Sequence, residues 1–199
     1  MLAAGLLVPA AGYLLGSIPV ADLVVGRRGA DLREVGDRNP GYWNAKEVVG
    51  RRAAIPVLAG DAAKGALAAA LGRSAARDDE WWLPVLGNAG SMFGHCWPLF
   101  AGFRGGRGVA TFAGGAVVIS PRSGAIALGL LGATWAATRS FAPAVRVGVA
   151  AYPVVQLAVD GARRTAATGA LMTLIGIRFA TARRESTGRQ RAYSRPRHR

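Results

Sequence analysis

The sequence predicts an all-α polytopic membrane protein with about seven transmembrane helices, its N-terminus outside and its C-terminus in the cytoplasm. Three observations predict this fold class. Of the 199 residues, 51% are hydrophobic and only 18% are charged, whereas about a quarter of the residues of a soluble domain are charged. The hydrophobic residues form long blocks rather than amphipathic stripes. The formal charge of +14 gathers between these blocks.

The first block covers residues 1–26 and contains one ionisable side chain, Asp22. It is long enough for a helix that crosses a bilayer, which takes about 20 residues. A cleaved signal peptide is the alternative, but such a peptide begins with a basic region. Here Arg27 and Arg28 follow the block instead, which favours an uncleaved span.

Six further blocks follow in order. Their many Gly and Ala residues suit close helix packing in lipid, and spans tolerate internal Pro when neighbouring groups satisfy the freed carbonyls. A soluble all-α protein would need polar faces on its outer helices, which most of these blocks lack. Because several blocks are short, one span fewer or one more stays open. The blocks cover residues 53–71, 82–103, 109–120, 123–138, 141–159 and 165–179.

The basic residues alternate between the two predicted sides of the membrane. Eighteen Lys and Arg lie in the first, third and fifth connections and in the C-terminal segment, and five lie in the other connections. The positive-inside rule assigns the richer set to the cytoplasm. Termini on opposite sides of the membrane require an odd number of spans, so the predicted count of seven agrees with the sides that the charges indicate. A nucleic-acid footprint would cluster Lys and Arg on one binding face, so we expect no nucleic-acid partner.

We expect one integral membrane domain over residues 1–182 and a disordered basic tail over residues 183–199 that meets anionic lipid head groups. The single cysteine, Cys96, has no partner within the chain, which excludes a disulfide scaffold. Imidazole and thiol groups are limited to His95, Cys96 and His198, and no zinc-site spacing occurs among them. We therefore expect no metal.

Three polar segments border or interrupt the blocks. The first includes Gly36, Asn39, Gly41 and Asn44, directly after the first block. Two Asn and two Gly so close together suit an ordered, turn-rich binding loop. An ordinary cytoplasmic loop with turn residues explains them as well.

The second segment lies inside the second block. Asp61 and Lys64 are three residues apart, so they share one helix face and can neutralise each other. Ionisable groups at membrane depth are expensive and usually face the bundle or a wet cavity. A structural pair and a contribution to a binding site are both open. His95, beside Trp97, is likewise either a site residue or a buried, hydrogen-bonded ring.

The third segment runs from Gly94 to Thr111 and contains Arg104-Gly-Gly-Arg107-Gly108. Glycines let backbone N–H groups converge on an anion, and the two arginines supply charge-assisted donors. Thr111 falls near the start of the next helix, where free amides also favour an anion. The Gly-Lys-Ser/Thr ending of a Walker A loop is absent. The pattern predicts a phosphate site, with a basic anchor on the cytoplasmic side as the alternative.

Four motifs occur in series over roughly residues 12–120. They are Gly16-Ser17-Ile18-Pro19; a loop motif with Asp31, Arg33, Gly36, Asn39, Gly41 and Asn44; Asp61, Lys64 and Gly65; and Gly94 to Thr111. In this series the chain resembles the bacterial membrane glycerol-3-phosphate acyltransferases that use acyl phosphate as donor, the PlsY type. Members of that family look alike in all four motifs, with Lys where this chain has Arg104 and Arg107.

The resemblance implies transfer of a fatty acyl group from acyl phosphate to glycerol 3-phosphate, which yields lysophosphatidic acid and phosphate in phospholipid biosynthesis. It implies no metal, no cofactor and no covalent acyl-enzyme. It also implies a multi-pass protein among the lipids of a bacterial cell membrane with a cytoplasmic active face, and it leaves the oligomeric state open. The implied catalytic residues are Arg107 and Asn39, and the implied substrate-binding residues are Arg33, Gly36, Gly41, Asn44, Lys64, His95, Arg104, Gly105, Gly106, Gly108 and Thr111.

The chain departs from the family pattern at several site positions. Arg107 in place of Lys keeps the charge but not the shape, and Asp37 and Glu47 add negative charge where anionic substrates bind. Two alternatives stay open: a catalytically impaired member acting as a membrane phosphate- or lipid-binding protein, and an enzyme with a shifted acceptor. The departures are Asp37 for serine, Arg38 for glycine, Tyr42-Trp43 for Ala-Thr, Glu47 for arginine, Phe179 for histidine and Ala182 for asparagine.

Overall fold

The protein is all-helical in a computed structural model that describes residues 2–193. Each predicted block is helical, which confirms the all-α class. Two 3-10 turns, η1 (Gly26–Arg28) and η2 (Leu99–Ala101), lie in the connections. The α-helices are α1 (Leu2–Gly16), α2 (Val20–Val25), α3 (Tyr42–Val49), α4 (Arg51–Ala75), α5 (Leu83–Cys96), α6 (Val109–Ile119), α7 (Pro121–Thr138), α8 (Phe141–Asp160) and α9 (Ala162–Tyr193).

Two of the predicted blocks end earlier than their composition suggests. The first breaks between α1 and α2, because Pro19 has no N–H to donate and its ring fixes φ. The block predicted over residues 82–103 is helical only as far as Cys96. Pro98 follows that helix end in an extended conformation, and a helix rarely continues into a proline. The freed segment, residues 97–108, becomes a loop that carries Arg104 and Arg107.

Two other segments are more helical than expected. Residues 42–49 form α3 after an extended Gly41, although the turn-rich loop was expected to run to Asn44. Ala45, Lys46 and Glu47 are good helix formers. The helix α9 runs to Tyr193 and so extends into the basic tail predicted over residues 183–199. Its Ala, Arg, Glu and Gln residues explain the extension, since they too favour helix. Residues 194–199 of the expected tail lie outside the described residues.

Four helical segments are long and apolar enough to cross a membrane: residues 3–25, 51–75, 141–160 and 162–182. The apolar helix α6 is shorter, with 11 residues, and at about 1.5 Å per residue it reaches about half of a bilayer core. The described part of the chain therefore contains four candidate membrane spans, which agrees with the predicted membrane class. The finer count of seven is taken up with the proposed function.

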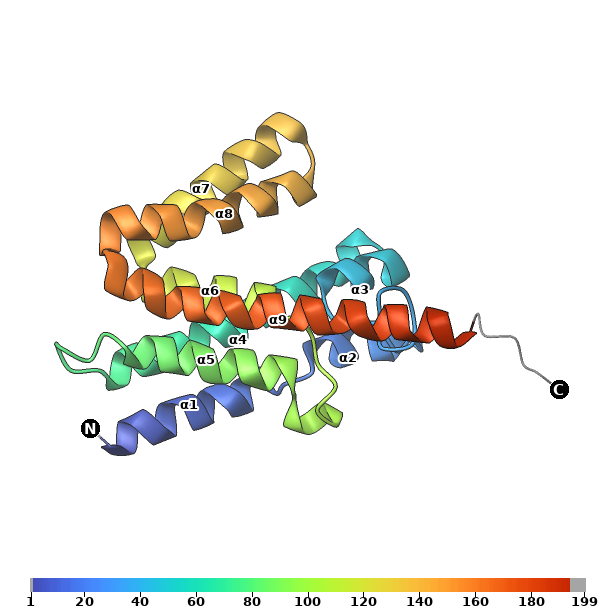
Figure 1. Cartoon of the computed structure of the whole chain (residues 1–199), viewed down its shortest axis with the longest axis horizontal. Coiled ribbons are helices and arrows are strands. Elements are labelled where there is room, and N and C mark those ends of the chain that lie inside the picture. The colour runs from blue at the N-terminus through green and yellow to red at the C-terminus, as the bar shows by residue number, and fades with distance from the viewer. Residues whose placement is uncertain (1, 194–199) are drawn as a thin grey trace.

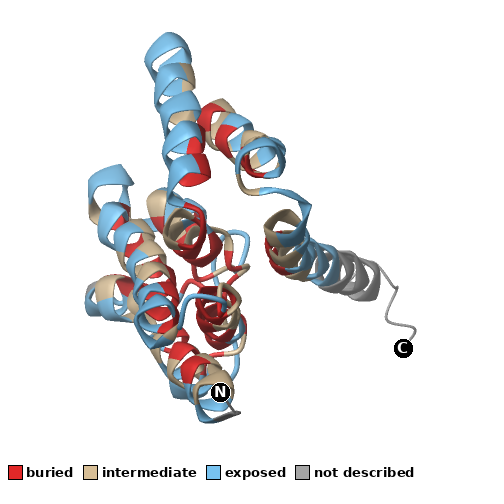
Figure 2. Ribbon diagram, turned by 90° about the vertical axis from the view of Figure 1, so that its left-hand side faces the viewer, coloured by how far each residue is buried: buried red, intermediate tan, exposed pale blue. Residues whose placement is uncertain are grey.

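Glycines bring the central helices α1, α4, α5 and α6 into backbone contact. A side chain on Gly12 of α1 would collide with the Gly87 carbonyl of α5, and one on Gly65 of α4 would collide with the Thr111 carbonyl of α6. Figure 2 shows that buried residues concentrate in this bundle, whereas its outer faces are mostly exposed, as is most of α7. Small residues at helix crossings are typical of packing in lipid.

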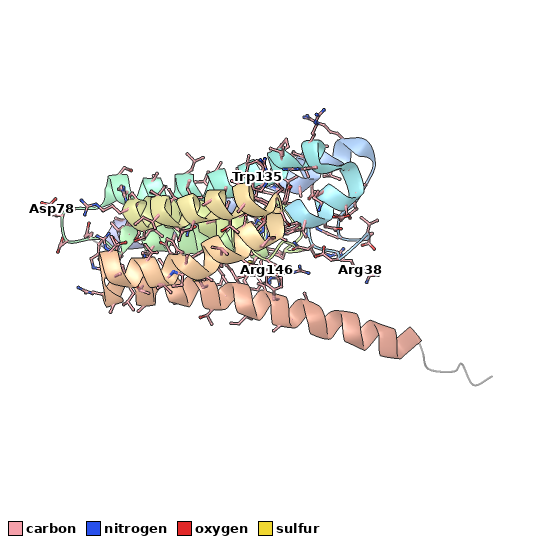
Figure 3. The ribbon with its side chains drawn as sticks, turned by 90° about the horizontal axis from the view of Figure 1, so that it is seen from above. Arg38, Asp78, Trp135 and Arg146 are labelled. Carbon is pink, nitrogen blue, oxygen red and sulfur yellow. The ribbon has the colours of Figure 1, made fainter. Side chains whose placement is uncertain are left out.

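The connections between helices alternate between the two ends of the bundle. Figure 3 shows Arg38 and Asp78 at opposite ends, and Figure 1 places the N-terminus at the end of the α4–α5 connection, away from α2 and α3. At the Arg38 end, Tyr42 of α3 contacts Phe141 at the start of α8, with ring centroids 5.6 Å apart. At the Asp78 end, the guanidinium of Arg163 lies 5.1 Å from the ring centroid of Trp81.

Candidate functional site

Three segments far apart in the sequence enclose a large open pocket at the Arg38 end of the bundle. They are the loop after η1, the loop between α5 and α6, and α9 near Arg178, which crosses both loops (Figure 1). The pocket has a volume of about 890 Å³. Its charged lining consists of Arg33, Arg38, Arg104, Arg107 and Arg178, with the acidic Glu34 and Asp37. The excess of guanidinium groups favours an anionic ligand.

Arg33 joins the first loop to the second. Its guanidinium donates to both oxygens of Asp22, over 2.7 and 3.0 Å, and its Nε donates to the Arg104 carbonyl over 2.7 Å. The hydrogen bond to Asp22 raises the pKa of Arg33 above its ordinary value, so the group stays charged. A guanidinium that is committed to a bidentate carboxylate has few donors left. Arg33 therefore acts first as a support for the loop that presents Arg104.

Arg178 holds the glycine-rich loop from the side of α9. It donates to the Gly105 and Gly106 carbonyls over 3.1 and 3.2 Å, and its guanidinium lies 5.0 Å from the ring centroid of Trp97. The Gly106 N–H donates to the His95 carbonyl over 3.0 Å. This amide is thus used within the loop, and the positive charge of the pocket comes from arginine side chains.

Arg107 lies between Asp37 and Phe179, two positions at which the chain departs from the family pattern. Its Nη1 donates to Asp37 Oδ2 over 2.8 Å, and its guanidinium lies 4.7 Å from the ring centroid of Phe179. The Arg107 side chain keeps 20% of its surface exposed and Asp37 keeps 43%. An exposed carboxylate and a largely covered arginine side chain form the edge of the pocket.

The first loop is shaped by a buried asparagine. The Asn44 amide donates to the Leu32 and Val35 carbonyls over 2.8 and 2.9 Å. Gly36 has a φ of +57°, and a Cβ there would collide with the Asn44 oxygen, so only glycine fits. This loop turns back so that Asn39 lines the pocket. Gly41 follows and begins α3.

Asp61, Lys64 and His95 form a buried cluster beneath the glycine-rich loop. Lys64 Nζ lies 2.9 Å from Asp61 Oδ1 and donates to the Ile18 carbonyl over 3.3 Å. His95 Nδ1 lies 3.4 Å from the same Asp61 oxygen. The cluster borders a cavity of about 20 Å³, which is room for about one water molecule. Among residues 2–193, no three His, Cys, Asp or Glu side chains gather as metal ligands would.

The predicted site residues fall into three groups. Some line the large pocket: Arg33, Gly36, Asn39, Arg104, Gly105 and Arg107. Lys64, His95 and Gly106 line the small cavity beneath it. Gly41, Asn44 and Gly108 shape the loops, Gly108 with a φ of +84° before α6. Thr111 is the exception, because it is fully buried against Gly65 and lines neither cavity.

Comparison with known proteins places the chain in one family. The family model named glycerol-3-phosphate acyltransferase matches residues 6–189. The chain belongs to this family. Its resemblance to the PlsY type is thereby confirmed, and the match extends to residue 189, within α9 and beyond the four motifs.

Three relatives are named glycerol-3-phosphate acyltransferases. The one from Synechococcus sp. is 35% identical over 177 residues, covering 88% of this chain and 87% of the relative. The one from Geobacter sulfurreducens is 35% identical over 170 residues, covering 85% and 84%. Glycerol-3-phosphate acyltransferase 5 of Dehalococcoides mccartyi is 40% identical over 144 residues, which is 72% of this chain. The chain spans about 60% of the length of that last relative.

The fold is that of a solved family structure. The crystal structure of PlsY (YgiH), an integral membrane glycerol 3-phosphate acyltransferase in its glycerol 3-phosphate form, superimposes with a TM-score of 0.76. The superposition covers 98% of this chain and 96% of that one at 24% identity. At this identity the likeness establishes the shared architecture of the family.

Two residues of the site were not among the predicted site residues: Asp22, which anchors Arg33, and Arg178, which holds the glycine-rich loop. Phe179, predicted only as a departure from the family pattern, covers Arg107. Asp22 had a signal, since it is the one ionisable group of the first block. Arg178 lies next to the departures at Phe179 and Ala182, and its contact with the distant glycine-rich loop could be recognised only in the structure.

Proposed function

We propose that the protein transfers a fatty acyl group from acyl phosphate to glycerol 3-phosphate, which yields lysophosphatidic acid and inorganic phosphate. The observation that carries this proposal is the arginine-lined pocket, which is built from the same loops that hold the family motifs. Both substrates carry phosphate, and guanidinium groups bind phosphate through two parallel hydrogen bonds. The acyltransferase names of the relatives also disfavour a purely phosphate- or lipid-binding role.

The proposed reaction needs two anions held side by side. The oxygen of an acceptor hydroxyl bonds to the acyl carbon, the bond from that carbon to the phosphate oxygen breaks, and the hydroxyl proton ends on the departing phosphate. Arg107 would hold the departing phosphate and Asn39 would orient the reacting groups with its amide. Positioning and stabilisation of developing charge supply most of the acceleration in such a site.

The membrane arrangement is part of the same proposal. We place one domain over residues 1–182 in a bacterial cell membrane, with seven spans, the N-terminus outside, and the pocket and C-terminus in the cytoplasm. The alternation of connections between the Arg38 and Asp78 ends supports this arrangement (Figure 3). So does the basic charge of the loops at the Arg38 end, because cytoplasmic loops are enriched in Lys and Arg.

The test uses purified protein in lipid, with acyl phosphate, glycerol 3-phosphate and an Arg107→Ala control. We expect lysophosphatidic acid and phosphate to form in equal amounts. We expect Arg107→Ala to lower the rate about a hundredfold or more, as loss of one charge-stabilising donor does in other enzymes. Product formation that requires no glycerol 3-phosphate, or that Arg107→Ala leaves unchanged, contradicts the proposal. Product from a different acceptor alone supports the shifted-acceptor alternative.

A further inference from the structure

The Asp37–Arg107 ion pair places a carboxylate where a phosphate ligand of Arg107 would bind. Asp37 Oδ2 accepts from Arg107 Nη1 over 2.8 Å, at the edge of the large pocket that both residues line. Carboxylate and phosphate oxygens are recognised by the same guanidinium donors. The two anions therefore compete for one position on Arg107.

We propose that Asp37 is an affinity-determining residue that occupies the phosphate position on Arg107 in the free protein and must leave it when a phosphate-bearing ligand binds. The inference rests on the proposed function, because it takes the large pocket as the place where substrate phosphate binds. It goes beyond that function by assigning a role to a carboxylate that stands where the family pattern has serine.

Asp37 is held ready for this position. Its other oxygen, Oδ1, accepts from the Asn39 backbone N–H over 3.1 Å, a short-range turn that aspartate favours. It lies between two residues in the left-handed region, Gly36 and Arg38, both with a φ of +57°. The backbone thus projects the carboxylate toward Arg107, and 43% of its side chain stays exposed to solvent, which leaves it room to move away.

Arg107 is equally prepared for an exchange of anions. The Phe179 ring lies against its guanidinium at 4.7 Å, so the group keeps its orientation when the carboxylate departs. Among the side chains that the structure describes, Arg107 Nε is buried with no hydrogen-bond partner, and unmet donors of this kind are costly. A phosphate with three or more acceptor oxygens could satisfy more of the guanidinium than the single Asp37 contact does.

The neighbouring acidic residue Glu34 provides a matched control. It also pairs with a pocket arginine, Arg104, but at 3.4 Å and with both side chains about two thirds exposed, 67% and 65%. Exposed pairs of that geometry contribute little. Removing either carboxylate changes the charge of the pocket by the same amount, yet only Asp37 occupies a position on Arg107.

The experiment titrates inorganic phosphate into the full chain in lipid nanodiscs by calorimetry, at constant ionic strength. We expect Asp37→Asn and Asp37→Ser to bind phosphate about tenfold more tightly than the unchanged protein. We expect Glu34→Gln to stay within about twofold of it. Adding Arg107→Ala to Asp37→Asn should abolish the gain, because the competing position then no longer exists.

Equal phosphate affinity in Asp37→Asn and the unchanged protein overturns the proposal, as does an equal gain in Glu34→Gln or no saturable binding in any variant. Thermal unfolding of each variant identifies misfolded protein, and Asp37→Ser serves as the second variant if Asp37→Asn misfolds. The readout is binding of inorganic phosphate without acyl transfer. Failure of the proposed function would instead appear as missing glycerol-3-phosphate-dependent product, so the two failures are distinguishable.

Discussion

Arg33 is the residue on which two loops of the site depend. Its bidentate contact with Asp22 fixes the guanidinium, and its Nε reaches the Arg104 carbonyl over 2.7 Å. Because only 12% of the Arg33 side chain is exposed, the contact is shielded from water and held firmly. The consequence is positional: Arg33 determines where the backbone that bears Arg104 lies, and it fills one wall of the pocket at the same time.

We expect Asp22→Asn to lower kcat/KM by about tenfold to a hundredfold, because displacing a positioned group by about 1 Å can cost that much. Asp31→Asn is the matched control, since Asp31 also meets Arg33, but at 3.4 Å and with 51% of its side chain exposed, so its effect should be small. Arg33→Lys should be impaired as well, because lysine lacks the planar fork. Steady-state kinetics measure all three. Equal rates for Asp22→Asn and Asp31→Asn would contradict a positioning role.

How far the sequence predicts the site also differs from residue to residue. Arg104 and Arg107 were predicted from local spacing, because a loop rich in glycine and arginine indicates anion binding, whereas the role of Asn39 was implied only by the family resemblance. The contact of Asp22 with Arg33 and that of Arg178 with the glycine-rich loop join segments far apart in the chain. Such contacts depend on how the helices pack, which local pattern does not encode. Thr111 shows the converse, since a favourable local position is turned inward by packing against Gly65.

At the scale of elements, α4 and α5 bury a charge cluster below the glycine-rich loop. Asp61 and Lys64 on α4 are 3% and 5% exposed, and His95 on α5 is 7% exposed. A Cβ on Gly106 would collide with His95 Nε2, so the loop rests directly on the histidine. The shared helix face of Asp61 and Lys64 was predicted from their spacing. The third member of the cluster, His95, comes from another helix, so its contact with Asp61 could not be predicted from spacing.

Lys64→Met should destabilise the protein by about 3 to 5 kcal/mol, because it leaves the buried Asp61 carboxylate with less compensation. The double variant Asp61→Asn with Lys64→Met removes both charges. We expect it to recover much of that loss, as neutral replacements of buried pairs often do. Thermal unfolding in detergent compares the two. A double variant no more stable than Lys64→Met would show that the pair is not what balances the cluster.

The sequence predicted most of the helical segments, but it predicted the residues at which the helices begin and end poorly. The break before α2 and the end of α5 lie at Pro19 and Pro98, where missing donors and ring sterics outweigh hydrophobicity. The helix α3 was missed because its eight residues carry no long apolar period. Its place is stabilised by Tyr42 and Trp43, whose rings both pack on Phe141 of α8 at 5.6 and 5.7 Å. That aromatic contact joins residues far apart in the sequence, so the local sequence pattern did not indicate it.

At the scale of the whole molecule, the +14 charge and the apolar bundle belong to one arrangement. The Arg38 end carries the pocket and the loops with Arg104 and Arg107, whereas the Asp78 end carries the acidic connection between α4 and α5 (Figure 3). Because loops rich in Lys and Arg usually lie on the cytoplasmic side of a membrane, such a bundle would be oriented with its pocket facing the cytoplasm. Substrates that carry phosphate would then reach the arginines from that side.

This orientation can be tested by labelling single cysteines introduced at the two ends of the bundle. Cys96 is the single cysteine and is fully buried, so the unchanged chain should resist a membrane-impermeant maleimide and serve as the control. We expect Asp78→Cys to be labelled on intact cells, because its connection lies at the predicted outer end. Arg38→Cys should be labelled only after the membrane is permeabilised, since it lies at the opposite end (Figure 3). The reverse pattern would invert the topology, and labelling of both positions on intact cells would mean that the bundle does not separate its two ends across a bilayer.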